Sequence, residues 1–197
     1  MTDEVTRGDA TRARLLQAAR DAFAERGYHA TSTRDIAAAA GMSPAAVYVH
    51  HRTKEEMLFL ISEWGHEQSL GRIQAAIATA EAPADQLAAV VRTYAAYHAE
   101  EHDIARILNY ELNELTPEHR VVIDGLRAQI DRAMRGIIER GVADGVFVCA
   151  DPRLATALIL STGIDLARWY REDARWSVAA ISDFYAAAAL RVVGVTS

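Results

Sequence analysis

The stretch between Asp35 and Glu55 is the part of the sequence best suited to bind phosphate, because it contains no acidic residue. Its basic and imidazole side chains are His50, His51, Arg52 and Lys54, the only lysine of the chain. Lys and Arg neutralise phosphate groups, and acidic neighbours would weaken that attraction. The stretch is therefore suited to face a nucleic acid. The alternative is that an alanine-rich segment of this length lacks acid by chance.

The pair His98 and His102 is a second candidate, because residues four apart lie on one face of a helix at metal-ligand spacing. His119 could supply a third ligand. The zinc-hydrolase pattern needs glutamate directly after the first histidine, however, and Ala99 stands there. A glycine-rich phosphate loop and a nucleophile elbow are also missing. We predict no enzymatic activity, cofactor or metal, with the histidines solvated or hydrogen-bonded; a metal at the pair is the open alternative.

The composition is that of a globular protein, since 51% of the 197 residues are hydrophobic and 24% are charged. A single cysteine, Cys149, excludes an internal disulfide and fits a reducing compartment. The N-terminus is acidic, and no apolar stretch reaches the roughly 20 residues of a membrane span. We expect a cytoplasmic protein that does not enter a membrane.

The net charge of −6 argues against a protein that coats nucleic acid with its whole surface. The charge is unevenly distributed, however. Residues 1–60 contain eight basic and eight acidic residues, whereas the rest of the chain contains 13 basic and 19 acidic ones. The acidity thus belongs to the second part, and the first part can approach phosphates.

Helix-forming residues dominate the chain and no convincing strand is visible, which predicts an all-α fold of about nine helices. The expected helices span 11–26, 32–40, 44–50, from 53 onward, 84–102, 104–114, 117–141, 152–171 and 177–193. The helix from 53 onward begins at a capping box, in which Thr53 accepts from the Glu56 N–H and Glu56 reaches back. The first three helices form a head, and the later ones a larger body.

Two short helices joined by a tight turn indicate a helix-turn-helix unit in the head. Ser32 can cap the first helix, and Gly41 can adopt the positive φ of the turn. Ser43 caps the second helix, and Pro44 takes its first position, where no N–H is needed. The second helix of such a unit can enter the major groove of DNA.

Together these segments resemble the TetR family of transcriptional regulators over about residues 9–60. The resemblance rests on Leu15-Leu16-Gln17-Ala18-Ala19 with Phe23 and Gly27-Tyr28, Thr31-Ser32-Thr33-Arg34-Asp35-Ile36-Ala37, Ala40-Gly41-Met42-Ser43, Val47-Tyr48-Val49-His50 and Lys54-Glu55-Glu56-Met57-Leu58. The family pattern has an aromatic residue, usually phenylalanine, where this chain has His51.

The resemblance implies a set of DNA-contacting residues in the head. They are Thr33, Arg34, Ser43, Ala45, Ala46, Tyr48, His50 and Lys54. Arg34 near a helix N-terminus suits phosphate, and alanine methyl groups can touch thymine methyl groups. Lys54 opposes the dipole of its own helix, which a phosphate would relieve. The alternatives are that Thr33 and Arg34 only cap and solvate their helix, and that Tyr48 packs inside the head.

The resemblance also implies a homodimer, in which the last two helices pair with their copies as a four-helix bundle. Suitable residues recur at helical spacing, namely Leu154, Ala157, Leu158, Ser161, Ile164, Asp165 and Arg168, and then Ile181, Phe184, Tyr185, Ala188 and Val192. A two-fold dimer predicts a near-palindromic operator in double-stranded DNA.

The body shows a weaker resemblance to regulators that respond to acyl-CoA or lipid catabolites. It rests on Trp169-Tyr170-Arg171, Asp183-Phe184-Tyr185, Ala189-Leu190-Arg191 and Asn109-Tyr110-Glu111-Leu112. This implies a small apolar or acyl-containing effector. The predicted pocket residues are Trp64, Tyr94, Tyr97, His98, Arg106, Asn109, Tyr110 and Asn113. The alternative is that the aromatic residues form the core and the polar ones are locally hydrogen-bonded.

The sequence thus predicts a ligand-released repressor that binds its operator as a homodimer. Residues 9–60 would form the DNA-binding domain, and residues 61–197 the effector-binding and dimerisation domain. The alternative function is a helical small-ligand or metal-binding protein that does not bind DNA.

Overall fold

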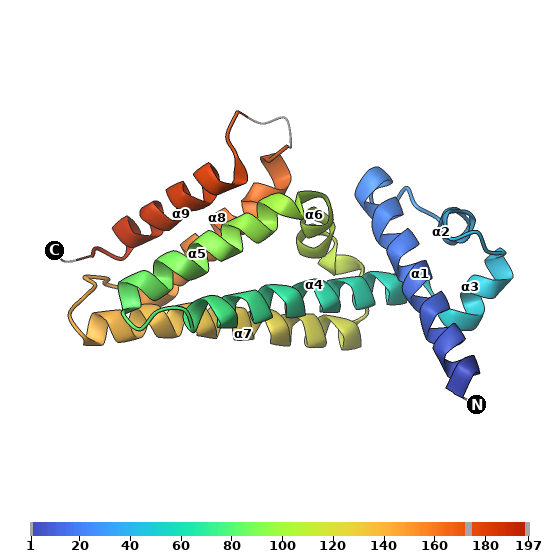
Figure 1. Ribbon diagram of the computed structural model, residues 1–197, viewed down its shortest axis with the longest axis horizontal. Helices are drawn as coiled ribbons and strands as arrows, with labels where there is room; N and C mark the ends of the chain where they lie inside the picture. The colour runs from blue at the N-terminus through green and yellow to red at the C-terminus, as the bar shows by residue number, and fades with distance from the viewer. Residues whose placement is uncertain (1, 172–174, 196–197) are drawn as a thin grey trace. The chain divides into compact units, whose positions relative to one another are not determined.

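The structure, a computed structural model, describes residues 2–171 and 175–195. In these ranges the chain forms nine α-helices, one 3-10 helix and no strand (Figure 1). The elements are α1 (Thr2–Arg26), α2 (Thr33–Ala39), α3 (Pro44–His50), α4 (Lys54–Ile77), α5 (Pro83–Glu100), α6 (His102–Tyr110), η1 (Leu112–Glu114), α7 (Pro117–Ala143), α8 (Pro152–Trp169) and α9 (Val178–Val192). The prediction of an all-α fold is confirmed. None of the described helices is long and apolar enough to cross a membrane.

The chain divides into two compact units. The first contains Met1–Gly65 and Arg106–Ile123, and the second contains His66–Ala105 and Asp124–Ser197. The chain passes from one unit to the other within α4, α6 and α7, so each of these helices belongs to both. The segment between α6 and α7 therefore shares a unit with the helices of the head.

The first unit has a core built on α1. Leu15, Ala19 and Phe23 lie one helical turn apart on its predicted apolar stripe, and all three are fully buried. α1 packs against α2 and α3, which contribute the fully buried Ile36 and Val47. This packing fixes the helix-turn-helix on one side of α1.

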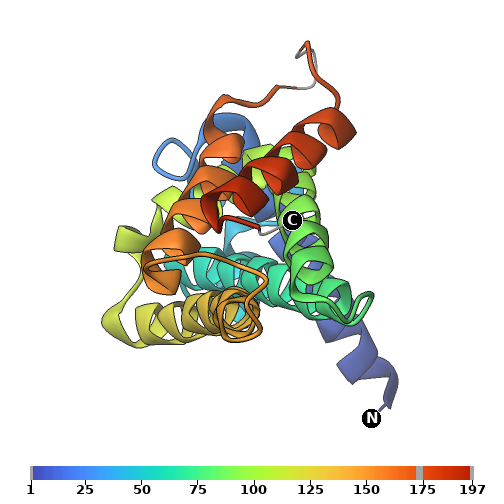
Figure 2. The ribbon, with the colours of Figure 1, turned by 90° about the vertical axis from the view of Figure 1, so that its left-hand side faces the viewer.

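The second unit is centred on α5, which packs against α8 and α9, as Figures 1 and 2 show from two directions. Its larger core cluster includes Leu87, Val90, Met134, Ile137 and Ile138. A smaller cluster consists of Ala95, Ala99, Leu166, Tyr170 and Ile181. Burial of these side chains supplies most of the driving force for folding of this unit.

Side-chain caps start several helices where the sequence predicts them. Ser32, Ser43 and Asp151 each accept a hydrogen bond from the first turn of their helix. At the start of α4, Thr53 accepts from the Glu56 N–H at 2.9 Å, as expected. The Glu56 carboxylate reaches back one residue further than a standard capping box, accepting from the N–H of Arg52 at 2.6 Å.

Candidate nucleic-acid interface

The turn between α2 and α3 has the geometry that its sequence predicts. Gly41 has a φ of 66°, in the left-handed region that glycine adopts without strain. Ser43 Oγ accepts from the Ala46 N–H at 3.3 Å, and Pro44 is the first residue of α3. These residues stop α2 and start α3 within three positions, which produces the helix-turn-helix.

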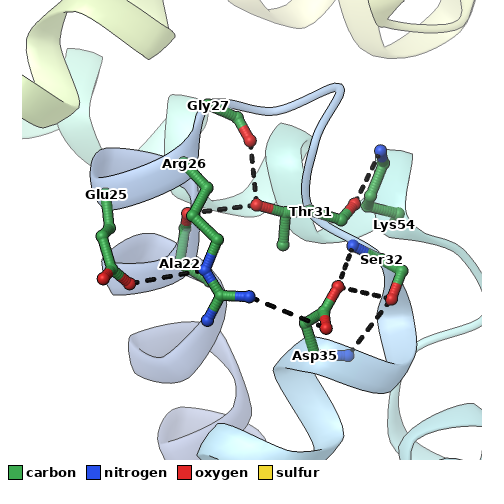
Figure 3. Close-up of polar contacts among 8 residues, drawn as sticks. All are labelled: Ala22, Glu25, Arg26, Gly27, Thr31, Ser32, Asp35 and Lys54. Carbon is green, nitrogen blue, oxygen red and sulfur yellow. Dashed lines mark hydrogen bonds and ion pairs between the residues drawn. The ribbon is translucent and has the colours of Figure 1, made fainter.

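The start of α2 is held by reciprocal hydrogen bonds between Ser32 and Asp35 (Figure 3). Ser32 Oγ accepts from the Asp35 N–H at 3.2 Å, and Asp35 Oδ2 accepts from the Ser32 N–H at 2.8 Å. The hydrogen bond from the Ser32 hydroxyl is the largest of the effects that lower the pKa of Asp35. The other carboxylate oxygen lies 3.7 Å from Arg26, in the last turn of α1. This ionised carboxylate therefore links α1 to α2.

Lys54 holds the loop between α1 and α2. Its ammonium group donates to the carbonyl oxygens of Tyr28 at 2.9 Å and Thr31 at 3.0 Å, and lies 4.0 Å from the centre of the Tyr28 ring. The Thr31 hydroxyl group lies within hydrogen-bonding distance of the Ala22 and Gly27 carbonyls (Figure 3). The two carbonyls bound by Lys54 offset the helix dipole at the start of α4. A phosphate contact of Lys54 stays a prediction.

Tyr48 lies on the surface of α3 and is 54% exposed. Its hydroxyl group is 3.1 Å from Thr33 Oγ1, within hydrogen-bonding distance. The alternative that Tyr48 packs inside the head therefore does not describe this structure. Because Thr33 is the first residue of α2, the pair joins the N-terminus of α2 to the middle of α3.

The predicted DNA contacts divide by exposure. The exposed members are Arg34, Ser43, Ala45 and Tyr48, and the half-buried members are Thr33, Ala46, His50 and Lys54. All eight belong to α2, α3, the turn between them or the first residue of α4. The structure thus brings together one short surface that carries positive charge and small side chains. Contact of these residues with DNA stays a prediction.

His51 fills the position where the family pattern has phenylalanine, and only 3% of its surface is exposed. Among the described residues, neither ring nitrogen makes a hydrogen bond of good geometry, and the backbone of Arg12 offers only a weak one. The pKa of His51 is lowered, and burial is the largest cause. The charges of His50 and Arg12 lower it further, whereas the backbone of Arg12 and the carboxylate of Glu56 raise it. The site therefore accommodates a neutral ring at the cost of unpaired polar atoms.

Replacement of His51 by Phe is expected to raise the free energy of unfolding by about 1 kcal/mol at pH 7, because a buried unpaired polar group is removed. The gain should grow as the pH falls below the ordinary histidine value of 6.5, because the unfolded chain then binds a proton that the folded head resists. Urea unfolding at several pH values measures both effects. The half-buried neighbour substituted in the same way, His50→Phe, is the control; an equal gain in both variants would contradict the explanation.

Two features of the head were not predicted from the sequence. Among the large hydrophobic side chains whose burial the structure describes, Val49 is the most exposed, at 77%. At the start of α4, Glu55 Oε1 is 2.8 Å from His119 Nδ1 and accepts from the Thr116 N–H at 2.9 Å. Phe59 stacks on the His119 ring with a centroid separation of 3.9 Å. Nothing in the local sequence pairs residues more than 50 positions apart, so periodicity could not reveal this contact.

The predicted effector residues are shared between the two units. Tyr94, Tyr97 and His98 lie in the second unit, where all three are buried on α5. The His98 ring lies against the Tyr94 ring at a tilt of 55°, with the ring centres 4.3 Å apart, and its Nδ1 lies 2.9 Å from the Tyr94 carbonyl oxygen. Burial lowers the pKa of His98 to about 4, so the ring is neutral at pH 7. Arg72 lies over the Tyr97 ring at 5.2 Å.

The other predicted effector residues belong to the first unit. Trp64, Tyr110 and Asn113 are exposed, and Arg106 and Asn109 are half-buried. The Arg20 guanidinium lies over the Trp64 ring, with its central carbon 5.1 Å from the ring centre. A common pocket for the whole set stays a prediction, and the buried cluster around His98 is its best-defined part.

The histidines considered as metal ligands have other contacts. His102 Nδ1 is 3.0 Å from the Ala99 carbonyl oxygen, and His98 bonds to Tyr94 as described. The third candidate, His119, lies beside Glu55. Within residues 2–171 and 175–195, no three His, Cys, Asp or Glu side chains come together as metal ligands would.

Two family models match the chain. Residues 15–61 match "Bacterial regulatory proteins, tetR family", and residues 80–193 match "Tetracyclin repressor-like, C-terminal domain". The first match covers the helix-turn-helix, and the second covers α5 through α9.

Individual proteins are similar over nearly the whole chain. The HTH-type transcriptional repressor KstR2 of Rhodococcus jostii is 31% identical, with 93% of this chain and 91% of that protein covered. The fatty acid metabolism regulator protein of Bacillus subtilis is 26% identical, with 86% and 88% covered. The crystal structure of a bacterial regulatory protein in the tetR family from Rhodococcus RHA1 superposes with a TM-score of 0.90 at 40% identity, over 95% and 98% of the two chains.

Proposed function

The chain belongs to the tetR family of bacterial regulatory proteins, and from that premise we propose that it represses transcription as a homodimer that an effector releases from DNA. It is a helix-turn-helix transcriptional regulator, and the alternative of a helical carrier that does not bind DNA is not favoured. We assign it no catalytic role. In this proposal the protein binds DNA in the cytoplasm.

The observation that carries this function is the short surface formed by α2, α3 and the start of α4. It combines a helix-turn-helix, exposed small side chains on α3 and the cations Arg34 and Arg52, and no acidic side chain occurs between Asp35 and Glu55. Such a surface can place a helix in the major groove while cations meet the phosphates.

The homodimer is supported by an exposed apolar face on α8 and α9. Leu154 and Leu158 of α8 and Phe184 and Val192 of α9 are between 41% and 69% exposed. A groove of about 250 Å³ runs between these helices beside Leu158, Phe184 and Val192. An apolar face of this kind marks a protein–protein interface, and a second copy presents the same face under two-fold symmetry.

Substitution of Phe184 by Glu tests the dimer, because a carboxylate would be buried at the centre of the paired faces. We expect wild-type protein to sediment with twice the chain mass of 21.6 kDa, and the variant to dissociate at least ten-fold more readily. Val121→Glu is the matched control, because Val121 is 71% exposed on α7, outside this face. Sedimentation velocity distinguishes the variants; a Phe184→Glu protein as dimeric as the control would exclude the α8–α9 interface.

The effector is an apolar or acyl-containing molecule in this proposal. The similar Bacillus protein is named as a regulator of fatty acid metabolism, and the body of this chain provides aromatic rings with the neutral His98. An effector releases the operator only through its higher affinity for the dimer that cannot bind DNA, typically by 1–3 kcal/mol. Displacement of labelled operator by fatty acyl-CoA thioesters of increasing chain length tests this class of ligand.

A route for the effector's influence follows from the connectivity. α4, α6 and α7 each contribute residues to both units, so a ligand that favours one arrangement of the second unit acts on helices that enter the first. There, Glu55 binds Thr116 and His119 and thereby joins the start of α4 to the start of α7. We assign the transmission of the effector signal to these shared helices.

A further inference from the structure

The outward face of α3 is almost entirely hydrocarbon. Pro44, Ala45 and Val49 are exposed on it, and Val49 reaches 77%. Ala45 and Val49 are four residues apart, so their methyl groups lie on the same side of the helix, one turn from each other. A valine exposed to this degree gains nothing from the core of the head.

The polar side chains of α3 and its cap are engaged in holding the head together. Ser43 Oγ accepts from the Ala46 N–H as the helix cap. The Tyr48 hydroxyl group lies at hydrogen-bonding distance from Thr33 on α2. His50, half-buried in the last turn of α3, is the remaining polar side chain of the helix. Between Ala45 and Val49, α3 therefore offers a major groove mainly methyl groups, because the one polar side chain in this stretch, Tyr48, already lies beside Thr33.

The major-groove edges of the base pairs carry one apolar group, the C5 methyl of thymine. We propose that Ala45 and Val49 select the operator by packing on thymine methyl groups, with Val49 as the main contact. This inference rests on DNA binding by the head. It goes beyond the proposed function because it assigns the chemistry of base recognition and the residue that performs it. Arg34 and Arg52 then supply phosphate attraction that is independent of sequence.

The test removes single methyl groups from the DNA. An operator is first selected with the full-length protein from an unmodified random pool, in which thymine is the only base with a C5 methyl group. Each thymine of one half-site is then replaced by deoxyuridine, and the dissociation constant is measured by fluorescence anisotropy. For wild-type protein we expect at least one position to bind about four-fold more weakly, the effect of one buried methyl group. For Val49→Ala the same replacement should change affinity less than two-fold.

Val121→Ala on α7 serves as the control and should keep the wild-type response, since Val121 is similarly exposed but lies outside α3. If every deoxyuridine operator binds wild-type protein within two-fold of the parent, methyl readout is wrong although DNA binding stands. An equal loss in wild type and Val49→Ala would also overturn the assignment to Val49. A pool that yields no bound sequence would instead contradict DNA binding itself, and this inference with it.

Discussion

Replacement of Lys54 by Met is expected to lower the free energy of unfolding by about 3 kcal/mol, because two hydrogen bonds from a charged donor are lost. Met keeps the apolar stem but cannot donate to the carbonyls of Tyr28 and Thr31, which Lys54 holds at 2.9 and 3.0 Å. The cation over the Tyr28 ring is lost as well. Urea unfolding at pH 7 and fixed protein concentration, followed by circular dichroism, measures the change.

The neighbouring variant Arg52→Met is the matched control. It removes the same charge from an exposed side chain, and Arg52 bonds to Glu56 through its backbone N–H, which the substitution keeps. If both variants unfold at the same urea concentration, the loop is not held by Lys54.

Operator binding by Lys54→Met separates a structural role from a phosphate contact. A lost phosphate contact would reduce the slope of log affinity against log salt by about one, whereas a positioning role alone would lower affinity at an unchanged slope.

Substitution of Gly163 by Ala is expected to destabilise the second unit by about 2–3 kcal/mol through overpacking. A Cβ atom at Gly163 on α8 would lie 2.6 Å from two ring carbons of Tyr94 on α5. The Tyr94 ring cannot withdraw easily, because it is buried and the His98 ring packs against it with the ring centres 4.3 Å apart. Thermal and urea unfolding measure the loss.

Gly71→Ala is the control for replacing a glycine within a helix, and here we expect the free energy of unfolding to rise. Gly71 lies in the exposed part of α4, and nothing is within 4 Å of the position of its Cβ. Alanine there should stabilise the helix by up to about 1 kcal/mol. Equal stability of the two variants would show that α5 and α8 do not approach as closely as described.

Local sequence signals predicted most helix starts because helix caps are local, whereas α1 begins at Thr2 rather than at residue 11 and the helix expected over 104–114 ends at Tyr110. Ser32, Ser43 and Asp151 cap α2, α3 and α8 with hydrogen bonds that span two or three residues. Proline at the first position starts α3, α5, α7 and α8. The turn residues Gly41, Ser43 and Pro44 then predicted that α2 and α3 form a helix-turn-helix, which the structure and the similar proteins confirm.

Contacts between distant residues account for what the sequence could not predict. The sequence indicates that Lys54 opposes the helix dipole, but the partners that hold it lie 23 and 26 residues earlier in the chain. The predicted effector residues share polar and aromatic character, but they belong to two different units because α4 and α6 cross from one to the other. Neither result has a signature in periodicity or composition.

In the proposed function, the two helix-turn-helix heads of one dimer bind a symmetric operator. Selection of bound fragments from a random DNA pool by the full-length protein, followed by sequencing, tests it most directly. We predict two copies of one half-site in inverted orientation, with centres about 34–36 Å apart or a multiple of that distance. A pool without enrichment, or one enriched for a single asymmetric site, would contradict this account.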